Sequence, residues 1–361
     1  YYSIRIIIRM YFGIDTCSGG TLTEKIRIIG GKQLKGEVFI SGAKNAVLKL
    51  MAAALLVKGA TKIYNVPELT DVVIMLNVLE QLGAKTSYDK KEKSIIIDAT
   101  ELTGVRASYE LVSRMRASFV VLGALVGRCK EAVVALPGGC AIGERKVDFH
   151  IKGLEALGTT VKIENGYVHA KAKKLTGGDI YLDIPSVGAT ENIMLASVLA
   201  EGSTRIQNAA QEPEIVDLAN FLNAMGADVN GAGTSEIVIN GVKQNDLHAV
   251  EYTTIPDRIE AGTYVAAFIA TRGKGIIRNI FPNHLTFYTS KLTKMGADIK
   301  LIDPTSIEVS CKKRLEAVNI ITQPYPGFPT DLQSLAMALA TVANGVSIIT
   351  ESLYENRFMQ V

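Results

Sequence analysis

The feature that most constrains the fold is a segment that recurs four times along the chain. Each copy is a short amphipathic helix that ends at a glycine, where a left-handed residue closes the last turn, and is followed by two alternating strands. The helical segments are Leu76–Ala84, Ile151–Thr159, Leu218–Ala227 and Ser290–Ala297. Their glycines, at positions 83, 158, 226 and 296, lie 75, 68 and 70 residues apart. The spacing predicts a structural unit of about 70 residues that repeats.

A second recurring pattern alternates with the first. It is a helix rich in small residues that runs into a β-branched strand, and small residues on one helix face allow close approach to a neighbouring helix or sheet. These helices are expected at Asn45–Leu56, Ala117–Val126, Glu191–Ala200, Glu260–Ala270 and Asp331–Ala343. Together the two patterns predict an α/β protein of βαβαββ-type units, three to a domain. If the architecture needs six units, roughly one and a half of them are missing after Val361.

Size and composition narrow the class of protein. A chain of 361 residues suits two domains with a cleft between them. The formal net charge is only +3, and the cations are dispersed, which does not favour a nucleic-acid partner. The four cysteines form no CxxC pair, so a disulfide framework or a zinc site is not indicated. The apolar run within Tyr1–Tyr11 is too short for a signal sequence or a membrane span, and we interpret residues 1–22 as an appendage.

Polar and cationic residues stand at the predicted start of successive small-residue helices. Lys44 and Asn45 begin the first helix, Arg116 precedes the second, and Ser186, Val187 and Gly188 precede the third. Free N–H groups at helix starts bind anions, and a cation beside them adds charge for a phosphate. Each residue taken alone fits an ordinary cap or a surface ion pair, but their recurrence at one position of the unit predicts a shared anion site.

Two further segments carry groups suited to catalysis. In the glycine-rich segment 136–145, Arg145 provides positive charge that would lower the pKa of the Cys140 thiol and make it a usable acid or nucleophile. Asp331 follows three prolines and a glycine, so it is either a helix cap or a positioned carboxylate base. Arg357, near the end of the chain, could contact a carboxylate or phosphate through two N–H groups.

The motifs resemble, in order and spacing from about Ile26 to Val361, those of the UDP-N-acetylglucosamine enolpyruvyl transferases. The matching blocks are SGAKNA, MRAS, LPGGCAIGER, VDFHIKGLEALG, SVGATEN, NAAQEPEIVD, PGFPTDLQ and YENRFM. The resemblance implies an inside-out α/β barrel of two domains that close over their substrates. It implies a first domain of residues 44–255 and an incomplete second domain of residues 23–43 and 256–361, with hinges near Ala43–Lys44 and Thr254–Asp257.

The same resemblance implies roles for individual residues. Cys140 would protonate the enolpyruvyl methylene and react with fosfomycin-type epoxides, and Asp331 would take the proton of the sugar 3-hydroxyl. Lys44 would act with them at the phosphate. The implied substrate-binding residues are Asn45, Arg116, Arg145, Ser186, Val187, Gly188 and Arg357.

The implied reaction transfers the enolpyruvyl group of phosphoenolpyruvate to UDP-N-acetylglucosamine, in peptidoglycan precursor synthesis. It releases phosphate and uses no metal or organic cofactor, and we expect a cytoplasmic monomer without nucleic-acid or membrane partners. A 3-phosphoshikimate 1-carboxyvinyltransferase and a non-catalytic UDP-sugar-binding paralogue remain as alternatives. In the family, the segment after Val361 carries two more arginines, so we expect the 361-residue chain to have little or no activity.

Overall fold

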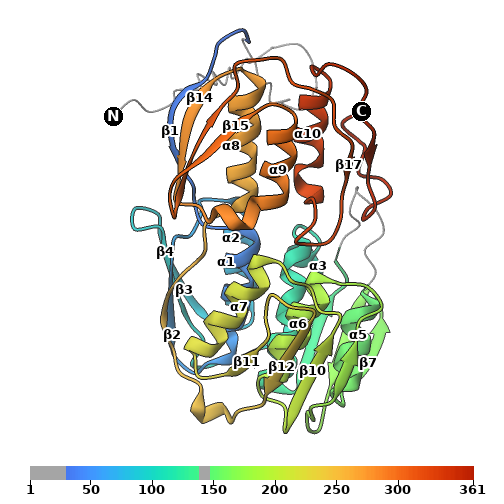
Figure 1. Ribbon diagram of the computed structural model, residues 1–361. Coiled ribbons are helices and arrows are strands. Elements are labelled where there is room, and N and C mark those ends of the chain that lie inside the picture. Colours follow the sequence, from blue (N-terminus) through green and yellow to red (C-terminus); the bar gives the residue numbers. More distant parts are fainter. Residues whose placement is uncertain (1–29, 138–146) are drawn as a thin grey trace, which may run out of the picture. The chain divides into compact units, whose positions relative to one another are not determined.

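The computed structural model of the protein describes residues 30–137 and 147–361 (Figure 1). The chain divides into two compact units. The large unit consists of Ser41–Glu260, Asn319–Ser334 and Ile348–Val361. Of the described residues, the small unit contains 30–40, Ala261–Val318 and Leu335–Ser347. The chain thus crosses between the units several times.

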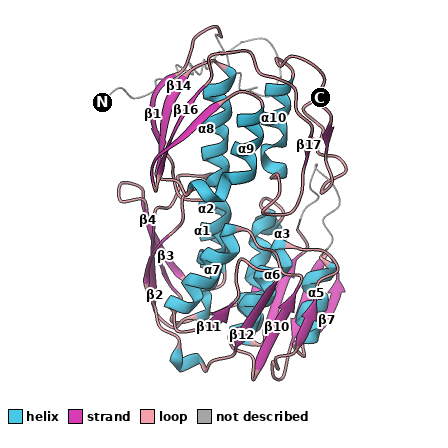
Figure 2. Ribbon diagram, viewed as in Figure 1, coloured by secondary structure: helices cyan, strands magenta, loops and turns pink. Residues whose placement is uncertain are grey.

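Three four-stranded sheets of the large unit share one topology. In each sheet an edge strand pairs in parallel with the next strand, which then pairs antiparallel with the second strand of a hairpin. Figure 2 colours the strands magenta and the helices cyan. In spatial order the first sheet is β13 (Glu251–Thr253), β2 (Ala60–Tyr64), β4 (Ser94–Asp98) and β3 (Lys85–Asp89). The second is β5 (Arg106–Ala107), β6 (Glu131–Ala135), β8 (Tyr167–Lys171) and β7 (Thr160–Glu164). The third is β9 (Asp179–Tyr181), β10 (Ser203–Gln207), β12 (Glu236–Asn240) and β11 (Asp228–Asn230).

Helices of the two predicted kinds accompany these sheets. The glycine-terminated helices are α2 (Thr70–Gln81), α5 (Asp148–Ala156) and α7 (Pro213–Ala224). The small-residue helices are α1 (Lys44–Ala53) with η1 (Ala54–Leu56), η2 (Arg116–Val120) with α4 (Val121–Cys129), and α6 (Val187–Ser197). Two short helices, α3 (Tyr109–Val112) and η3 (Gln244–Asp246), complete the set. Every residue of α1 from Ala46 onward is buried, so this helix lies inside the unit.

Glycine allows α4 and α6 to approach closely. A Cβ atom added at Gly123 would lie only 2.2 Å from the backbone oxygen of Asn192, and one at Gly127 would lie 2.9 Å from the oxygen of Leu195. Real side chains do not tolerate such distances in a close-packed interior. The small residues of these helices are therefore a packing requirement.

The small unit contains a fourth sheet of the same topology. In spatial order its strands are β1 (Lys35–Phe39), β14 (Lys274–Arg278), β16 (Ser306–Ser310) and β15 (Asp298–Asp303). Most of α8 (Arg258–Ala270), η4 (Pro282–Leu285), α9 (Thr286–Lys294) and most of α10 (Gln333–Ala340) belong to this unit. The buried Tyr288 of α9 donates its hydroxyl to the Gly262 oxygen of α8 at 3.2 Å. In the large unit, η5 (Thr330–Leu332) and the parallel strands β17 (Ile320–Ile321) and β18 (Ile349–Thr350) come from the last part of the chain.

The prediction of an α/β protein built from repeated βαβαββ-type units is confirmed, because one sheet topology occurs four times within the described residues. The helix-terminal glycines adopt positive φ, as the repeat predicted. The segments expected to be hinges lie against each other, since Gly42 and Pro256 form an antiparallel bridge. Their role as hinges and the predicted domain boundaries stay predictions. Within the described ranges, no helix is both long and apolar enough to cross a lipid bilayer.

Candidate active site

The predicted site residues of the large unit stand at equivalent positions of successive repeats. Lys44 is the first residue of α1, Arg116 is the first residue of η2, and Val187 is the first residue of α6. The 3-10 helix η2 packs against both α1 and α6, so the structure brings these three helices together. Each start presents backbone N–H groups that its own helix does not use. Such N–H groups can bind an anion, and the shared anion site itself stays a prediction.

Lys44 is held through both its backbone and its side chain. Its backbone N–H donates to Asp257 Oδ2 at 3.2 Å, and its ammonium lies 3.4 Å from Asp71 Oδ2. The other oxygen of Asp257 accepts from the N–H groups of Ile259 and Glu260 and thereby caps α8. One carboxylate therefore joins the starts of two helices. The Lys44 side chain is 44% exposed, which leaves its ammonium accessible to a ligand.

The turn Ser186–Gly188 is half-buried and shaped by two contacts. Ser186 Oγ accepts a hydrogen bond from the backbone N–H of Ala189 at 3.4 Å and caps α6. A Cβ atom at Gly188 would lie 3.0 Å from Cε1 of His150, so a larger residue would press on that ring. A glycine at the start of α6 therefore leaves room for that ring.

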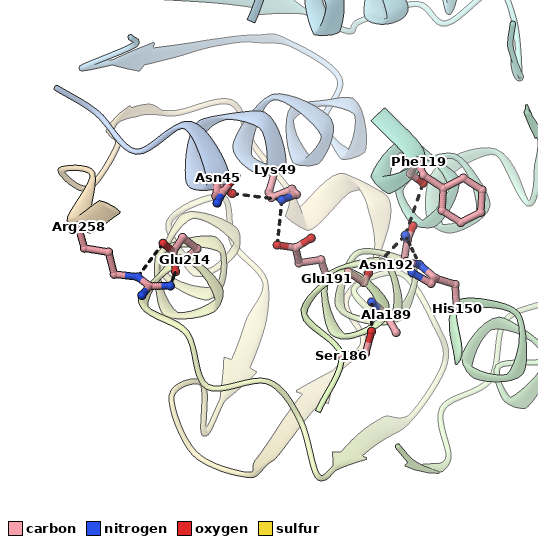
Figure 3. A network of polar contacts seen from close by, with 11 residues as sticks. Asn45, Lys49, Phe119, His150, Ser186, Ala189, Glu191, Asn192, Glu214 and Arg258 are labelled. Carbon is pink, nitrogen blue, oxygen red and sulfur yellow. Dashed lines mark hydrogen bonds and ion pairs between the residues drawn. The ribbon is translucent and has the colours of Figure 1, made fainter. Parts of the chain in front are cut away.

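Asn192 connects α6 to three other elements (Figure 3). Its Oδ1 accepts from the N–H of Gly123 on α4 at 2.6 Å, and its Nδ2 lies 2.8 Å from Nδ1 of His150 on α5. Nδ2 also lies 3.5 Å from the Phe119 oxygen of η2. Burial, and secondarily the charge of Arg116, lowers the pKa of His150 to about 3. The imidazole is therefore neutral at pH 7, and Nδ1 can accept the Asn192 proton.

A buried ion pair joins α6 to α1 (Figure 3). Lys49 Nζ lies 3.2 Å from Glu191 Oε1, with side chains that are 10% and 1% exposed. The same ammonium donates to the backbone oxygen of Asn45 at 3.2 Å. Burial raises the pKa of Glu191 to about 7, and the charge of Lys49 opposes that shift.

A second buried ion pair lies between α7 and α8. Arg258 donates through Nε and Nη2 to the two carboxylate oxygens of Glu214, at 3.0 and 3.3 Å. Both side chains are at most 10% exposed. The guanidinium also lies 5.5 Å from the centre of the Tyr325 ring. This pair fixes the beginning of α8 beside the segment that leads to η5.

Asp331, the predicted base, forms an ion pair with Arg357, a predicted substrate-binding residue. Asp331, on η5, accepts a hydrogen bond from Nη2 of Arg357. Their side chains are 39% and 22% exposed. Asn45 is exposed on the first turn of α1. Two predicted residues, Cys140 and Arg145, lie outside the described residues, and the catalytic and binding roles of the whole set stay predictions.

Sequence reasoning missed the buried polar groups beneath these helix starts. They are Lys49, Glu191, Asn192, His150 and Glu214. A signal was available for three of them, because Lys49 interrupts the apolar face of α1 while Glu191 and Asn192 interrupt that of α6. A charged residue in such a position needs a buried partner.

Comparisons with known proteins identify the family. The family model described as EPSP synthase (3-phosphoshikimate 1-carboxyvinyltransferase) matches residues 28–361. UDP-N-acetylglucosamine 1-carboxyvinyltransferase 2 of Carboxydothermus hydrogenoformans is 52% identical over 339 residues, which are 94% of this chain and 80% of that protein. UDP-N-acetylglucosamine 1-carboxyvinyltransferase of Gloeobacter violaceus is 51% identical over 336 residues, which are 93% of this chain and 72% of that protein.

Solved structures agree with this result. The enolpyruvyl transferase NikO from Streptomyces tendae has a TM-score of 0.80 at 25% identity and matches 90% of this chain and 76% of its own. EPSP synthase from Acinetobacter baumannii, at a TM-score of 0.66 and 19% identity over 89% of this chain and 74% of its own, has the same fold. The family model, these relatives and the shared fold thus define a transferase of the enolpyruvyl, or carboxyvinyl, class. The chain belongs to the EPSP synthase family, and its relatives at about 50% identity are UDP-N-acetylglucosamine 1-carboxyvinyltransferases.

Proposed function

We propose that the protein transfers the enolpyruvyl group of phosphoenolpyruvate to the 3-hydroxyl of UDP-N-acetylglucosamine and releases phosphate. The observation that carries this proposal is the packing of η2 against both α1 and α6, because the starts of these three helices carry Lys44, Arg116 and the Ser186–Gly188 turn. Both substrates are anions, and helix starts with nearby cations suit them. The names of the relatives at about 50% identity point to the same acceptor.

Each predicted residue has a task in this reaction. Lys44 and Arg116, with Arg145, would offset the charge of the diphosphate and of the departing phosphate. Asn45 and the Ser186–Gly188 turn, Val187 included, would orient the UDP-sugar. Asp331 would remove the proton from the sugar hydroxyl, and Cys140 would donate one to the methylene carbon. This addition gives a tetrahedral ketal with a methyl group, and loss of a proton from that methyl group together with inorganic phosphate then gives the enolpyruvyl ether.

Arg357 would control when Asp331 can act as a base. It is paired with Asp331, so a phosphoenolpyruvate carboxylate or phosphate that attracts the guanidinium would free the aspartate to act as a base. The base would then become available only when the donor substrate is bound. This coupling protects the acceptor hydroxyl from unproductive deprotonation.

Calorimetric titration with the two candidate acceptors tests the proposal. We expect UDP-N-acetylglucosamine to bind and shikimate 3-phosphate to leave no heat signal. Addition of phosphoenolpyruvate to the enzyme should then release inorganic phosphate and increase the mass of the UDP-sugar by one enolpyruvyl group. Preferential binding of shikimate 3-phosphate would instead identify a 3-phosphoshikimate 1-carboxyvinyltransferase. Binding of the UDP-sugar without turnover would identify a non-catalytic paralogue.

Covalent labelling tests the role of Cys140 without requiring turnover. A fosfomycin-type epoxide incubated with the protein and UDP-N-acetylglucosamine should modify Cys140, as read by peptide mass spectrometry, and the Cys140→Ser variant should stay unlabelled. Cys129 and Cys311 serve as internal controls, because burial raises the pKa of both thiols and keeps them protonated. Labelling of those two cysteines at the same rate would refute a special reactivity of Cys140.

The cellular setting follows from the same proposal. A UDP-sugar and phosphoenolpyruvate are cytoplasmic metabolites, so we propose a cytoplasmic enzyme of peptidoglycan precursor synthesis that acts as a monomer without membrane or nucleic-acid partners. We also propose that no metal or organic cofactor takes part, since side-chain acids and bases account for each proton transfer. The first domain would be residues 44–255, and the second would comprise residues 23–43 and 256–361.

A further inference from the structure

Three consecutive polar residues are buried inside α6. The exposed fractions of Thr190, Glu191 and Asn192 are 0%, 1% and 0%. Thr190 accepts from the N–H of Ala210 at 3.2 Å, and Asn192 reaches α4 and α5 as described above. Burying such groups costs free energy unless each one has a partner. The partner of Glu191, the charged member of the three, is Lys49 on α1.

The Lys49–Glu191 pair lies close to two predicted substrate contacts. Lys49 is one helical turn after Asn45 and binds the Asn45 carbonyl at 3.2 Å, while its ammonium lies 3.2 Å from Glu191. Glu191 lies one helical turn after Val187, which is the first residue of α6. A displacement of either side chain would therefore move a first turn that carries substrate-binding residues. Figure 3 shows the pair between the two helices.

Stability alone does not account for a pair of this kind. Replacement of a buried ion pair by apolar residues of similar volume is often neutral or stabilising, because the desolvation of two charges offsets their attraction. A hydrophobic pair in α1 and α6 would also suit the apolar surroundings of these helices. What the ion pair adds is a defined distance and direction between two helices.

We propose that Lys49 and Glu191 are positioning residues, which hold the first turn of α1 in register with the first turn of α6 so that both turns engage the UDP-sugar together. The inference rests on the binding roles proposed above for Lys44, Asn45 and the Ser186–Gly188 turn. It assigns a function to two residues that do not contact the substrate.

The pair also makes substrate binding sensitive to pH. Burial raises the pKa of Glu191 to about 7, so the carboxylate gains a proton as the pH falls below neutrality. The other charges that act on it are Lys49 on α1, Glu214 on α7 and Glu212 just before α7. Of these only Lys49 attracts the carboxylate, and protonation removes that attraction. Binding of UDP-N-acetylglucosamine should weaken from pH 8 to pH 6.

A neutral double variant separates positioning from stability. In Lys49→Met/Glu191→Leu neither member of the pair remains charged, so we expect the thermal unfolding midpoint to stay within a few degrees of wild type. We expect the Kd for UDP-N-acetylglucosamine, measured by calorimetry at pH 8, to rise at least about tenfold, as misplaced contacts do. The variant should also lose the change of Kd between pH 6 and pH 8. A variant that keeps both the wild-type Kd and its pH dependence overturns the proposal.

Two further proteins complete the experiment. Lys62→Met/Glu92→Leu removes an ion pair at the surface of the same unit, where the atoms lie 3.1 Å apart, and should leave the Kd and its pH dependence unchanged. Lys44→Gln tests the underlying assignment, because loss of UDP-sugar affinity is expected from the proposed function alone. If Lys44→Gln binds like wild type, the proposed site fails. If it binds weakly while the Lys49/Glu191 double variant binds normally, only the positioning role fails.

Discussion

Asp331 and Arg357 form an ion pair in which Nη2 of Arg357 donates to Oδ1 of Asp331. Asp331 lies on η5, which follows the proline-rich segment, and Arg357 lies near the end of the chain. The guanidinium of Arg357 is therefore hydrogen-bonded to the carboxylate that we propose as the general base. Because both side chains are partly exposed, a substrate anion can compete for the guanidinium.

Removal of the Asp331 carboxylate should affect turnover rather than acceptor binding. In Asp331→Asn, we expect kcat to fall by roughly 10²–10⁴, the usual contribution of a general base, with the Kd for UDP-N-acetylglucosamine within about threefold of wild type. Phosphate release measures the first quantity and calorimetry the second. Asp183→Asn, at an aspartate that is 68% exposed, is the matched control. Full turnover by the Asp331→Asn variant would exclude Asp331 as the base.

Replacement of only one member of the buried Arg258–Glu214 ion pair should lower the free energy of unfolding. Arg258→Met leaves Glu214 buried without its partner, so we expect the free energy of unfolding to fall by about 3–5 kcal/mol. The double change Arg258→Met/Glu214→Leu should recover most of that loss, because neither member of the pair remains charged. Urea unfolding measures both variants.

The control for that prediction is Arg205→Met. Arg205 is 50% exposed and lies 3.7 Å from Asp179 and 3.8 Å from Glu236, so its loss should cost no more than about 1 kcal/mol. A similar loss in the Arg205 and Arg258 variants would mean that burial does not determine the energy of these pairs.

The repeat and the helix starts were predictable because they follow from local sequence. Glycines at 83, 158, 226 and 296 end helices wherever they occur, and the Asn165-Gly166 pair forms its hairpin turn with positive φ at both residues. The partners of Lys49 and Asn192 were not predictable, since they lie on other helices, far away in the sequence. The edge strand β13 pairs with β2 for the same non-local reason.

Small residues at the α4–α6 contact should not tolerate even one added methyl group. In Gly123→Ala the new Cβ would lie 2.2 Å from the backbone oxygen of Asn192, which cannot rotate away. We expect a loss of about 2–3 kcal/mol in the free energy of unfolding, measured in urea. Gly178→Ala is the control, because its nearest neighbour is the Ala156 oxygen at 4.0 Å. Equal stability of the two variants would show that α4 and α6 can separate without cost.

The buried imidazole of His150 should make folding sensitive to acid. Its pKa falls from 6.5 in the unfolded chain to about 3 in the fold, chiefly through burial. Between these values the unfolded chain binds the additional proton, so this group's contribution to stability is complete above pH 6.5 and declines as the pH falls toward 3. The expected loss from pH 7 to pH 5 is about 2 kcal/mol.

Because burial raises the pKa of Glu191 and Asp217, these two carboxyls contribute with the opposite sign over part of this range, and only a comparison of variants isolates His150. We expect His150→Gln to lose about 2 kcal/mol less than wild type between pH 7 and pH 5, as measured by urea unfolding at each pH. His169→Gln, at a partly exposed histidine on β8, is the control for the substitution itself. If His150→Gln follows the wild-type curve, the imidazole gains its proton over the same pH range in the fold as in the unfolded chain, and burial does not lower its pKa.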